Sequence, residues 1–254
     1  MKTFEYYRDL VLVLTRKEIK VRYASSILGY LWSIANPLAI SFVFYIAFKI
    51  VMRVQIEAYT LFLITGLFPW QWLSNSISVS PTIFLGNASI IKKVNFPRNV
   101  LPLVTVLQDM VHFILAIPVI IIFMFIYHKT PSWSWLYGIP ILLIVQACTA
   151  YGIAMVISSV NLFFRDTERL VSIFLMLIFY FTPIIYPASM VPQQYQWLLA
   201  ANPFSPLMIN WRTLFLDGTM NLTYLSFSVI YAGVFLATGL WVYRKLHWRF
   251  AEVL

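Results

Sequence analysis

Few residues in this chain of 254 amino acids could carry out chemistry. The three histidines, the single cysteine and the nine acidic residues show no spacing typical of a catalytic or metal-binding set. The sequence contains no G-x-x-x-x-G-K-[ST] motif for binding phosphate, because none of its eight glycines is followed by lysine. We therefore expect no catalytic residue, no metal and no cofactor in this chain, and no ATP bound to it.

Two ionisable residues, Asp109 and His112, lie in the opening turns of the otherwise apolar segment 104–127. Ionisable groups in such segments act as relays in carriers driven by ion gradients, or they form contacts between helices. The sequence favours the second interpretation, an inter-helix hydrogen bond or an interfacial contact. A gradient-driven carrier stays open as an alternative.

The composition indicates that lipid is the solvent for most of the chain. Hydrophobic residues make up 61% and charged residues 11%, whereas globular chains carry about 25% charged residues. A helix needs about 20 apolar residues to cross roughly 30 Å of hydrocarbon. Six segments provide this length: 34–53, 58–82, 104–127, 136–160, 169–188 and 222–243. Because backbone groups in lipid must bond within their own segment, the sequence predicts an all-α membrane protein with six transmembrane helices.

The basic residues predict the orientation of these helices. If both termini are cytoplasmic, 14 of the 18 Lys and Arg residues fall in the cytoplasmic segments 1–33, 86–99, 161–169 and 244–254. The opposite orientation would violate the positive-inside tendency. The net charge of +9 is therefore mainly a topology signal, and its spread over four segments argues against nucleic-acid binding.

Residues 1–30 predict an amphipathic helix, followed by a bend, that lies along the membrane surface. On a helical wheel, one sector holds the polar residues Lys2, Glu5, Asp9, Arg16 and Lys20. The opposite sector holds the apolar residues Phe4, Tyr7, Leu10, Val11, Leu14 and Val21. A plain basic segment next to the membrane is the alternative interpretation.

The stretch RYASSILGYLWSIANPL (22–38) joins this helix to the first span. Its small residues permit close packing against another helix, Trp32 suits the interface, and Pro37 disrupts backbone pairing. We expect the chain to turn near Gly29 and to form a gate at a cytoplasmic pore entrance. The residues assigned to this cytoplasmic gate are Arg22, Tyr23, Ser26, Leu28, Gly29, Tyr30, Trp32 and Pro37.

The segment GNASIIKKVNFP (86–97) predicts a short rigid helix on the cytoplasmic side. Asn87 or Ser89 can cap this helix, and Pro97 can end it. Its apolar patch and its donors for carboxylates comprise Ile90, Ile91, Val94, Lys92 and Lys93. Such a peg suits docking into the groove of a partner, although the spacing alone fits an ordinary helical loop as well.

Between the fifth and sixth spans, residues 187–218 predict two short helices that dip into the outer leaflet. Pro192 can open the first, which stops before Asn202 and Pro203. Ser205 can cap the second, with Pro206 in its first turn and Gly218 just past its end. An inert amphipathic loop resting on the membrane is the alternative interpretation.

Five motifs, in order along the chain, carry a resemblance to a known family. They are RYASSILGYLWSIANPL, NASIIKKVNFPRNVLPL, NLFFRDTERL, FYFTPIIYP, and NPFSPL with the following Arg212. They resemble ABC-2-type permeases that export cell-surface polysaccharides, above all the permease subunit of O-antigen (lipopolysaccharide) exporters. The resemblance implies a homodimer in the inner membrane that pairs with two separate ATPase subunits, and these subunits bind the ATP and Mg.

The resemblance also assigns roles to segments of the six-span domain 31–254. It makes 86–97 the coupling helix that receives the ATPase stroke, with the residues Asn87, Ser89, Ile90, Ile91, Lys92, Lys93 and Val94. It makes the helices of 190–218 the outer gate, with the residues Met190, Pro192, Trp197, Pro203, Pro206, Trp211 and Arg212. The loop 161–170 receives no specific role.

Aromatic residues, 18% of the chain, suggest the path of the cargo. Sugar rings stack on aromatic faces through their C–H groups, and such contacts tolerate sliding. The candidates for the substrate channel are Phe42, Tyr45, Phe174, Tyr180 and Phe181. Contact with lipid or with other helices is an equally good interpretation for any one of them.

The favoured hypothesis is a permease subunit that moves lipid-linked polysaccharide outward, driven by ATP hydrolysis on a partner. An ABC-2 permease for a drug or small lipid is the nearer alternative. A gradient-driven carrier and a membrane scaffold without transport are alternatives from other classes. A membrane-embedded enzyme is disfavoured because no cluster of chemically active residues is present.

Overall fold

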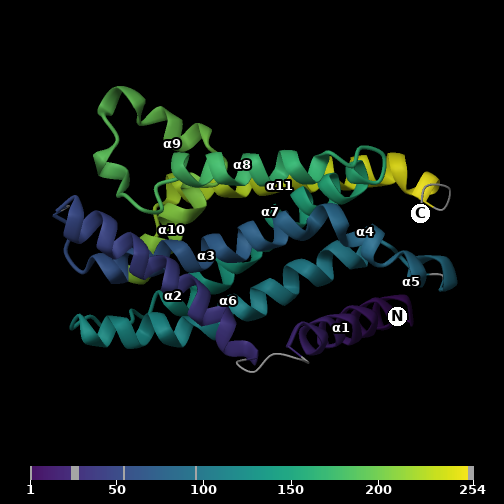
Figure 1. Ribbon diagram of the computed structural model, residues 1–254, viewed down its shortest axis with the longest axis horizontal. Coiled ribbons are helices and arrows are strands. Elements are labelled where there is room, and N and C mark those ends of the chain that lie inside the picture. Colours follow the sequence, from purple (N-terminus) through teal and green to yellow (C-terminus); the bar gives the residue numbers. More distant parts are fainter. Residues whose placement is uncertain (1, 24–28, 54, 95, 251–254) are drawn as a thin grey trace.

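The computed structural model describes residues 2–23, 29–53, 55–94 and 96–250, and these residues form helices and connecting loops without any strand. The all-α prediction is thus confirmed for the described chain. The long helices are α1 (Lys2–Tyr23), α2 (Trp32–Phe44), α3 (Tyr59–Val79), α6 (Val100–Ile126), α7 (Trp135–Asn161), α8 (Thr167–Phe181) and α11 (Leu222–Leu246). The shorter ones are α4 (Ile83–Gly86), α5 (Ala88–Lys93), α9 (Trp197–Ala201) and α10 (Ser205–Asp217) (Figure 1).

Four helical segments among the described residues are long and apolar enough to cross a membrane. They are Ile34–Val51, Val100–Ile126, Trp135–Asn161 and Leu222–Arg249. Two further predicted spans correspond to α3 and α8, which fall short for different reasons. The 21-residue α3 is long enough but carries several polar residues, and α8 has only 15 residues.

Prolines explain where the observed helices depart from the predicted boundaries. The helix α8 ends at Phe181, not at 188, because Thr182 precedes Pro183 and takes an extended conformation. By contrast, Pro37 does not interrupt the first span, since it lies inside α2. The Ser41 hydroxyl donates a hydrogen bond of 2.8 Å to the Pro37 carbonyl, and α2 continues into a π-helical segment, Tyr45–Val51.

The bundle is organised around α3 and around the pair α7 and α11. The helix α3 contacts α2, α6, α7, α8 and α10, and most of its side chains are buried. The most extensive contact between two helices joins α7 to α11. Gly152 and Gly239 make this contact possible, because a Cβ added at either residue would collide with the backbone of the opposite helix.

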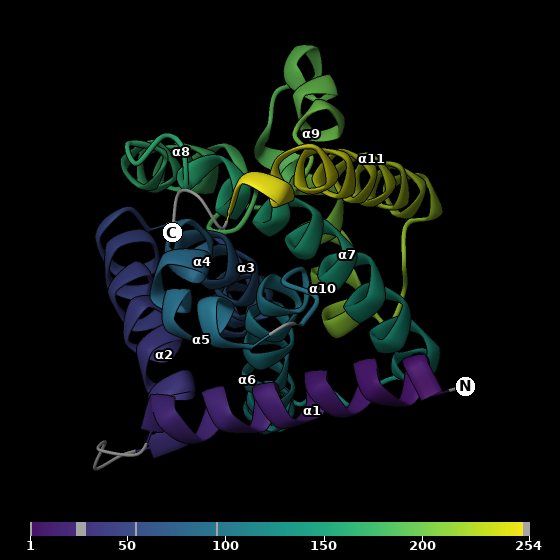
Figure 2. The same cartoon turned by 90° about the vertical axis from the view of Figure 1, so that its right-hand side faces the viewer.

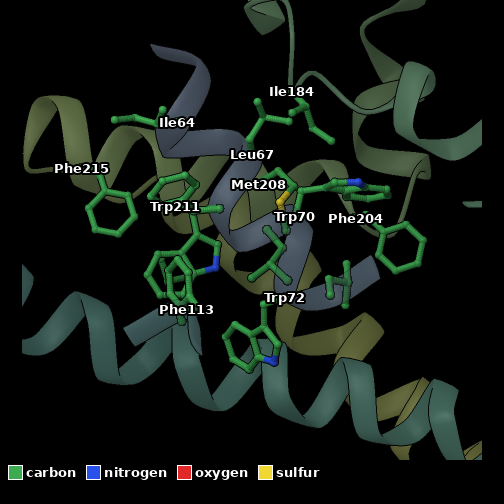
Figure 3. Close-up of a cluster of buried hydrophobic side chains, with 14 of the residues drawn as sticks. Ile64, Leu67, Trp70, Trp72, Phe113, Ile184, Phe204, Met208, Trp211 and Phe215 are labelled. Carbon is green, nitrogen blue, oxygen red and sulfur yellow. The ribbon is translucent and has the colours of Figure 1, made fainter. Parts of the chain in front are cut away.

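The main core is formed chiefly by α3, α6, α7 and α10, and it contains a group of aromatic residues (Figure 3). Phe113 of α6 meets Trp211 of α10 edge to face at 4.9 Å between ring centroids. Trp72 of α3 stacks on the same phenylalanine at 5.6 Å, and Trp211 stacks on Phe215 at 5.4 Å. Offset and edge-to-face pairs of this kind stabilise a core beyond the burial of their area.

A second, smaller cluster lies near the ends of the chain. It contains the buried residues Ile83, Phe84, Ile91, Phe96, Leu101, Leu162 and Phe250. These residues come from α4, α5, the first turn of α6, the end of α7 and the segment after α11. The two ends of the described chain therefore lie with α4 and α5 at one end of the molecule, as Figure 1 shows.

The N-terminal helix α1 runs across the bundle and packs against α6 (Figure 2). Its residues Leu10 and Leu14 are half-buried and contact the second cluster. Glu5, Arg16 and Lys20 of the predicted polar sector are exposed, and so is Tyr7 of the predicted apolar sector. Its position along a membrane surface stays a prediction.

Candidate functional site

An open groove between α3 and α8 combines polar and aromatic side chains. It has a volume of about 390 Å³ and is lined by Trp70, Ser74, Asn75, Ser78, Ser172, Leu175, Met176, Phe179 and Tyr180. The three serine hydroxyls each donate to a carbonyl of their own helix at 3.0 to 3.3 Å, which leaves oxygen lone pairs for other donors. Such a surface offers hydrogen-bond acceptors and aromatic faces together.

Aromatic contacts connect this groove to α2. Phe179 of α8 stacks on Phe44 of α2 with ring centroids 5.8 Å apart, and it lies 5.8 Å from the ring of Trp70. The helices α2, α3 and α8 thus meet around the ring of Phe179. Tyr186 follows α8 and donates its hydroxyl to the Tyr180 carbonyl at 3.1 Å.

The five residues predicted for the channel do not share one surface. Tyr180 lines the groove, whereas Phe174 meets the ring of Phe204 on the other side of α8. Phe181 is exposed but does not line the groove. On the first span Phe42 is 64% exposed and Tyr45 is half-buried. Only Tyr180 therefore contributes to the groove itself.

Sequence reasoning missed the polar residues of α3, although a signal was present. Gln71, Ser74, Asn75 and Ser78 follow the spacing i, i+3, i+4, i+7, which places them on one face of a helix. Treating 58–82 simply as an uncharged apolar stretch concealed this polar stripe. In a membrane helix, polar side chains usually face other protein or water.

The helix α5 is short, and the structure corrects how its ends form. The Asn87 side chain does not cap it but donates to the Ile83 carbonyl at 2.8 Å, and Ser89 lies inside the helix. The helix ends because Val94 is extended, before Pro97 is reached. Asn87 contributes through its backbone carbonyl, which accepts from the amides of Ile90 and Ile91.

The residues of the predicted apolar patch of α5 are divided between the protein interior and the exposed surface. Ile91 is only 6% exposed and belongs to the second cluster, and the half-buried Ile90 packs against that cluster. Ile91 is therefore not on the exposed surface of α5, and its assignment to ATPase coupling stays a prediction. The outward surface of α5 consists of Ser89, Lys92, Lys93 and Val94.

The second cluster fixes α5 to the ends of several long helices. Phe84 and Phe250 meet at 4.8 Å between ring centroids, and Leu101 and Leu162 extend the cluster to α6 and α7. A packed apolar core has low compressibility and transmits displacement. A force on α5 would consequently reach the ends of α6, α7 and α11.

The predicted turn before the first span is present at Gly29, which has a φ of +47° and begins a short 3-10 turn, Gly29–Leu31. Trp32 is 52% exposed and Pro37 is buried. Ser26 and Leu28 lie outside the described residues, as do the side chains of Arg22, Tyr23 and Tyr30. The structure therefore describes two parts of the predicted cytoplasmic gate: the bend at Gly29 and the start of α2.

The outer segment folds close to the prediction, with a different cap. A 3-10 turn, Gln193–Tyr195, follows Pro192, and α9 ends directly before Asn202 and Pro203. Pro206 lies in the first turn of α10, and Gly218 ends that helix with a φ of +64°. Ser205 does not cap α10; instead, the side-chain oxygen of Asn202 accepts a 3.0 Å hydrogen bond from the Phe204 amide.

The residues predicted for the outer gate separate into two groups. Met190, Pro192 and Trp197 are exposed and Pro203 is half-buried, whereas Pro206, Trp211 and Arg212 are buried within α10. The indole of Trp211 donates to the Gln146 side chain at 2.6 Å, and Gln146 donates to the Pro69 carbonyl at 2.8 Å. Trp211 and Arg212 are thus enclosed by protein in this chain, and their role in an outer gate stays a prediction. They connect α10 to the core and to the segment after α8.

Arg212 holds this segment through its guanidinium. It donates 2.5 Å hydrogen bonds to the carbonyls of Pro183 and Ile184, and it lies 3.8 Å above the ring of Phe62. Tyr59 donates to the next carbonyl, that of Ile185, at 2.9 Å. The non-helical backbone of 183–185 is thus satisfied by side chains from α3 and α10, as buried backbone requires. The motifs FYFTPIIYP and NPFSPL, with Arg212, form one structural unit.

Asp109 is 3% exposed and accepts a 2.9 Å hydrogen bond from the Ser76 hydroxyl of α3. The predicted inter-helix hydrogen bond is therefore confirmed. His112 is also buried, one turn further along α6.

Long apolar helices joined by buried hydrogen bonds define the class as a helical membrane protein. The chain belongs to the ABC-2 type transporter family, whose model matches residues 9–216. It is 49% and 51% identical, over 98% of its length and 96% of theirs, to two proteins from Klebsiella pneumoniae, each named O-antigen export system permease protein RfbA.

A protein of the same name from Myxococcus xanthus is 31% identical over 83% of this chain and 82% of its own length. These names describe the relatives. For this chain, the family match establishes a multi-pass transporter subunit.

Proposed function

We propose that the chain is the permease subunit of an ABC exporter that moves lipid-linked polysaccharide of the O-antigen type from the cytoplasm to the outside. The observation that carries this proposal is the similarity, over nearly the whole chain, to permeases named for O-antigen export. The polar and aromatic groove supports it, because acceptor oxygens and aromatic faces suit a hydroxyl-rich cargo. An ABC-2 permease for a drug or small lipid fits these relatives less well.

In the proposed topology the chain crosses the inner membrane six times, and both of its termini lie in the cytoplasm. The joint location of α1, α5 and the end of α11 supports an even number of crossings. The non-helical segment after α8 and the short α9 and α10 would then form a re-entrant outer unit. Irregular backbone is tolerated at membrane depth when protein buries it, as Arg212 and Tyr59 do here.

Energy enters, in this proposal, from two ATPase subunits that bind ATP and Mg, since this chain has no phosphate-binding loop. The exposed residues Ser89, Lys92, Lys93 and Val94 of α5 would contact an acidic groove of the ATPase. Movement of α5 would shift the packing of α6, α7 and α11 through the second cluster. The protein would thereby change between closed and conducting arrangements.

The cargo path, in this proposal, lies between two copies of the chain that face each other with α2, α3 and α8. These helices carry the groove and several exposed aromatic residues, including Phe42 and Tyr180. Met190, Pro192 and Trp197 would border its outer end, and the start of α2 its cytoplasmic end. Arg212 holds the outer unit together through its hydrogen bonds and does not line the pore.

The test is complementation of a strain that lacks this gene, scored by immunoblotting of surface polysaccharide and by co-purification of an ATPase. We expect restored polysaccharide and a bound ATPase. In proteoliposomes, transport should require ATP and the ATPase subunits. Transport by this chain alone along an ion gradient would refute the proposal and favour a gradient-driven carrier.

A further inference from the structure

A cleft between α2, α3 and α6 is separate from the groove described above. It has a volume of about 190 Å³ and is lined by Trp32, Asn36, Pro37, Phe68, Gln71, Trp72, Asn75, Asp109, His112, Phe113 and Ala116. Among the described residues, only Asn75 lines both the cleft and the α3–α8 groove. The cleft is therefore a side pocket that adjoins the groove at one residue.

The cleft contains hydrogen-bonding groups that the protein itself leaves unused. The half-buried side-chain amides of Gln71 and Asn75 make no hydrogen bond to any other residue in the described part of the chain. An amide has two donors and an acceptor with two lone pairs, and most buried polar atoms are hydrogen-bonded. These two amides are thus available to a polar ligand.

A carboxylate and a rigid aromatic wall complete the cleft. Asp109 is held in place by the Ser76 hydroxyl, and ionisable residues of membrane helices almost always face other protein or a polar cavity. Trp72 stacks on Phe113, and its indole donates to the Val106 carbonyl at 3.1 Å, so this wall is fixed (Figure 3). Flat apolar walls with a few convergent polar groups are typical of small-molecule sites.

The lining indicates a neutral ligand rich in hydroxyl groups. Amides accept from and donate to hydroxyls, the carboxylate accepts from them, and the apolar wall offers contact for C–H groups. Phosphate or diphosphate is disfavoured because the described lining residues include neither Lys nor Arg. The volume of about 190 Å³ is sufficient for one sugar ring.

We propose that this cleft binds one sugar unit of the exported saccharide, with Gln71, Asn75 and Asp109 as the hydrogen-bonding residues and Trp72 as the wall. The proposal rests on the proposed function and adds a recognition site beside the conduction groove. Asn75 gives the cleft its connection to that groove. A polysaccharide that slides along the groove then presents one sugar ring at a time to the cleft, and the cleft binds the sugar that fits it.

The test uses the full-length permease in lipid nanodiscs. Equilibrium dialysis measures binding of the repeat-unit oligosaccharide released by mild acid from the surface polysaccharide of the source strain. Gln71→Met keeps the side-chain length and removes the amide, so we expect Kd to rise roughly three- to tenfold, the effect of one hydrogen bond. Gln71→Met combined with Asn75→Leu should raise Kd by about tenfold or more.

The matched control is Ser226→Ala, which removes an exposed hydroxyl from α11, a helix with no residue among those described as lining the cleft or the groove. Its Kd should stay within about twofold of the parent, and the melting temperature of every variant should match the parent. Unchanged binding in Gln71→Met, or no binding by a parent that exports, would overturn the inference. Complementation distinguishes the two proposals: a parent chain that fails to restore surface polysaccharide contradicts the proposed function itself.

Discussion

Replacing Arg212 should release the segment that follows α8. Its guanidinium donates to two backbone carbonyls, and a hydrogen bond to a charged group contributes about 1.5–3 kcal/mol. Arg212→Met keeps apolar contact with Phe62 but removes both donors. Part of the loss is offset because a buried charge no longer has to be desolvated. We therefore expect local opening of 183–185 to become easier by about 3 kcal/mol, a factor of about 100 in its equilibrium constant.

Maleimide labelling measures this opening directly. Ile184 is fully buried, so an Ile184→Cys probe in a Cys148→Ala background reacts only when the segment opens. Labelling should accelerate about 100-fold when Arg212→Met is added. Arg212→Lys should fall between the two, since an ammonium cannot reproduce the planar fork that reaches both carbonyls. Arg244→Met, which removes an exposed cation at the end of α11, is the control and should leave the rate unchanged.

Two results would refute this reasoning about Arg212. Equal labelling rates for Arg212→Met and the parent would show that the guanidinium does not hold the segment. A rate for Arg212→Lys equal to that of the parent would show that charge alone, and not the fork geometry, is responsible. Melting temperatures in detergent must be measured alongside, because global unfolding would also expose Ile184→Cys.

Three further predictions concern the coupling helix, the helix packing and the groove. Lys92→Glu with Lys93→Glu should abolish co-purification of the ATPase without changing the melting temperature, since both side chains are exposed; undiminished co-purification would contradict the docking role. Gly152→Ala should destabilise the fold by about 1–3 kcal/mol because the added methyl collides with the α11 backbone, whereas Gly233→Ala, with open space around it, should not; equal melting temperatures would contradict this. Tyr180→Ala should slow export in the complementation assay with assembly intact, and normal export would remove Tyr180 from the path.

The two parts of the outer segment show how far sequence reasoning reached. The prolines and Gly218 act locally on the backbone, so the breaks around α9 and α10 could be predicted. The burial of Trp211 and Arg212 could not, because it depends on Gln146 of α7 and on the carbonyls after α8. Those groups lie far away in the sequence, and no local pattern relates them to α10.

The same division holds for the helix α5. Its existence follows from a short helix-forming stretch before a proline-containing loop. The inward position of Ile91 follows from Phe84 and Phe250, which meet only when the two ends of the chain come together. A prediction from spacing alone therefore grouped an anchoring residue with the exposed ones.

By itself, the sequence determined that this is a helical membrane protein, roughly where its long helices lie, and that it contains no phosphate-binding loop of its own. Transfer of apolar segments into lipid depends on local composition, which a sequence displays directly. Only the tertiary structure decided which side of each helix faces protein. In lipid both sides are apolar, so the hydrophobic pattern that orients a helix in water gives little guidance. The packing of the helices brings the amides of Gln71 and Asn75 next to the carboxylate of Asp109. It also brings the guanidinium of Arg212 to the carbonyls after α8. Neither contact can be predicted from the sequence alone.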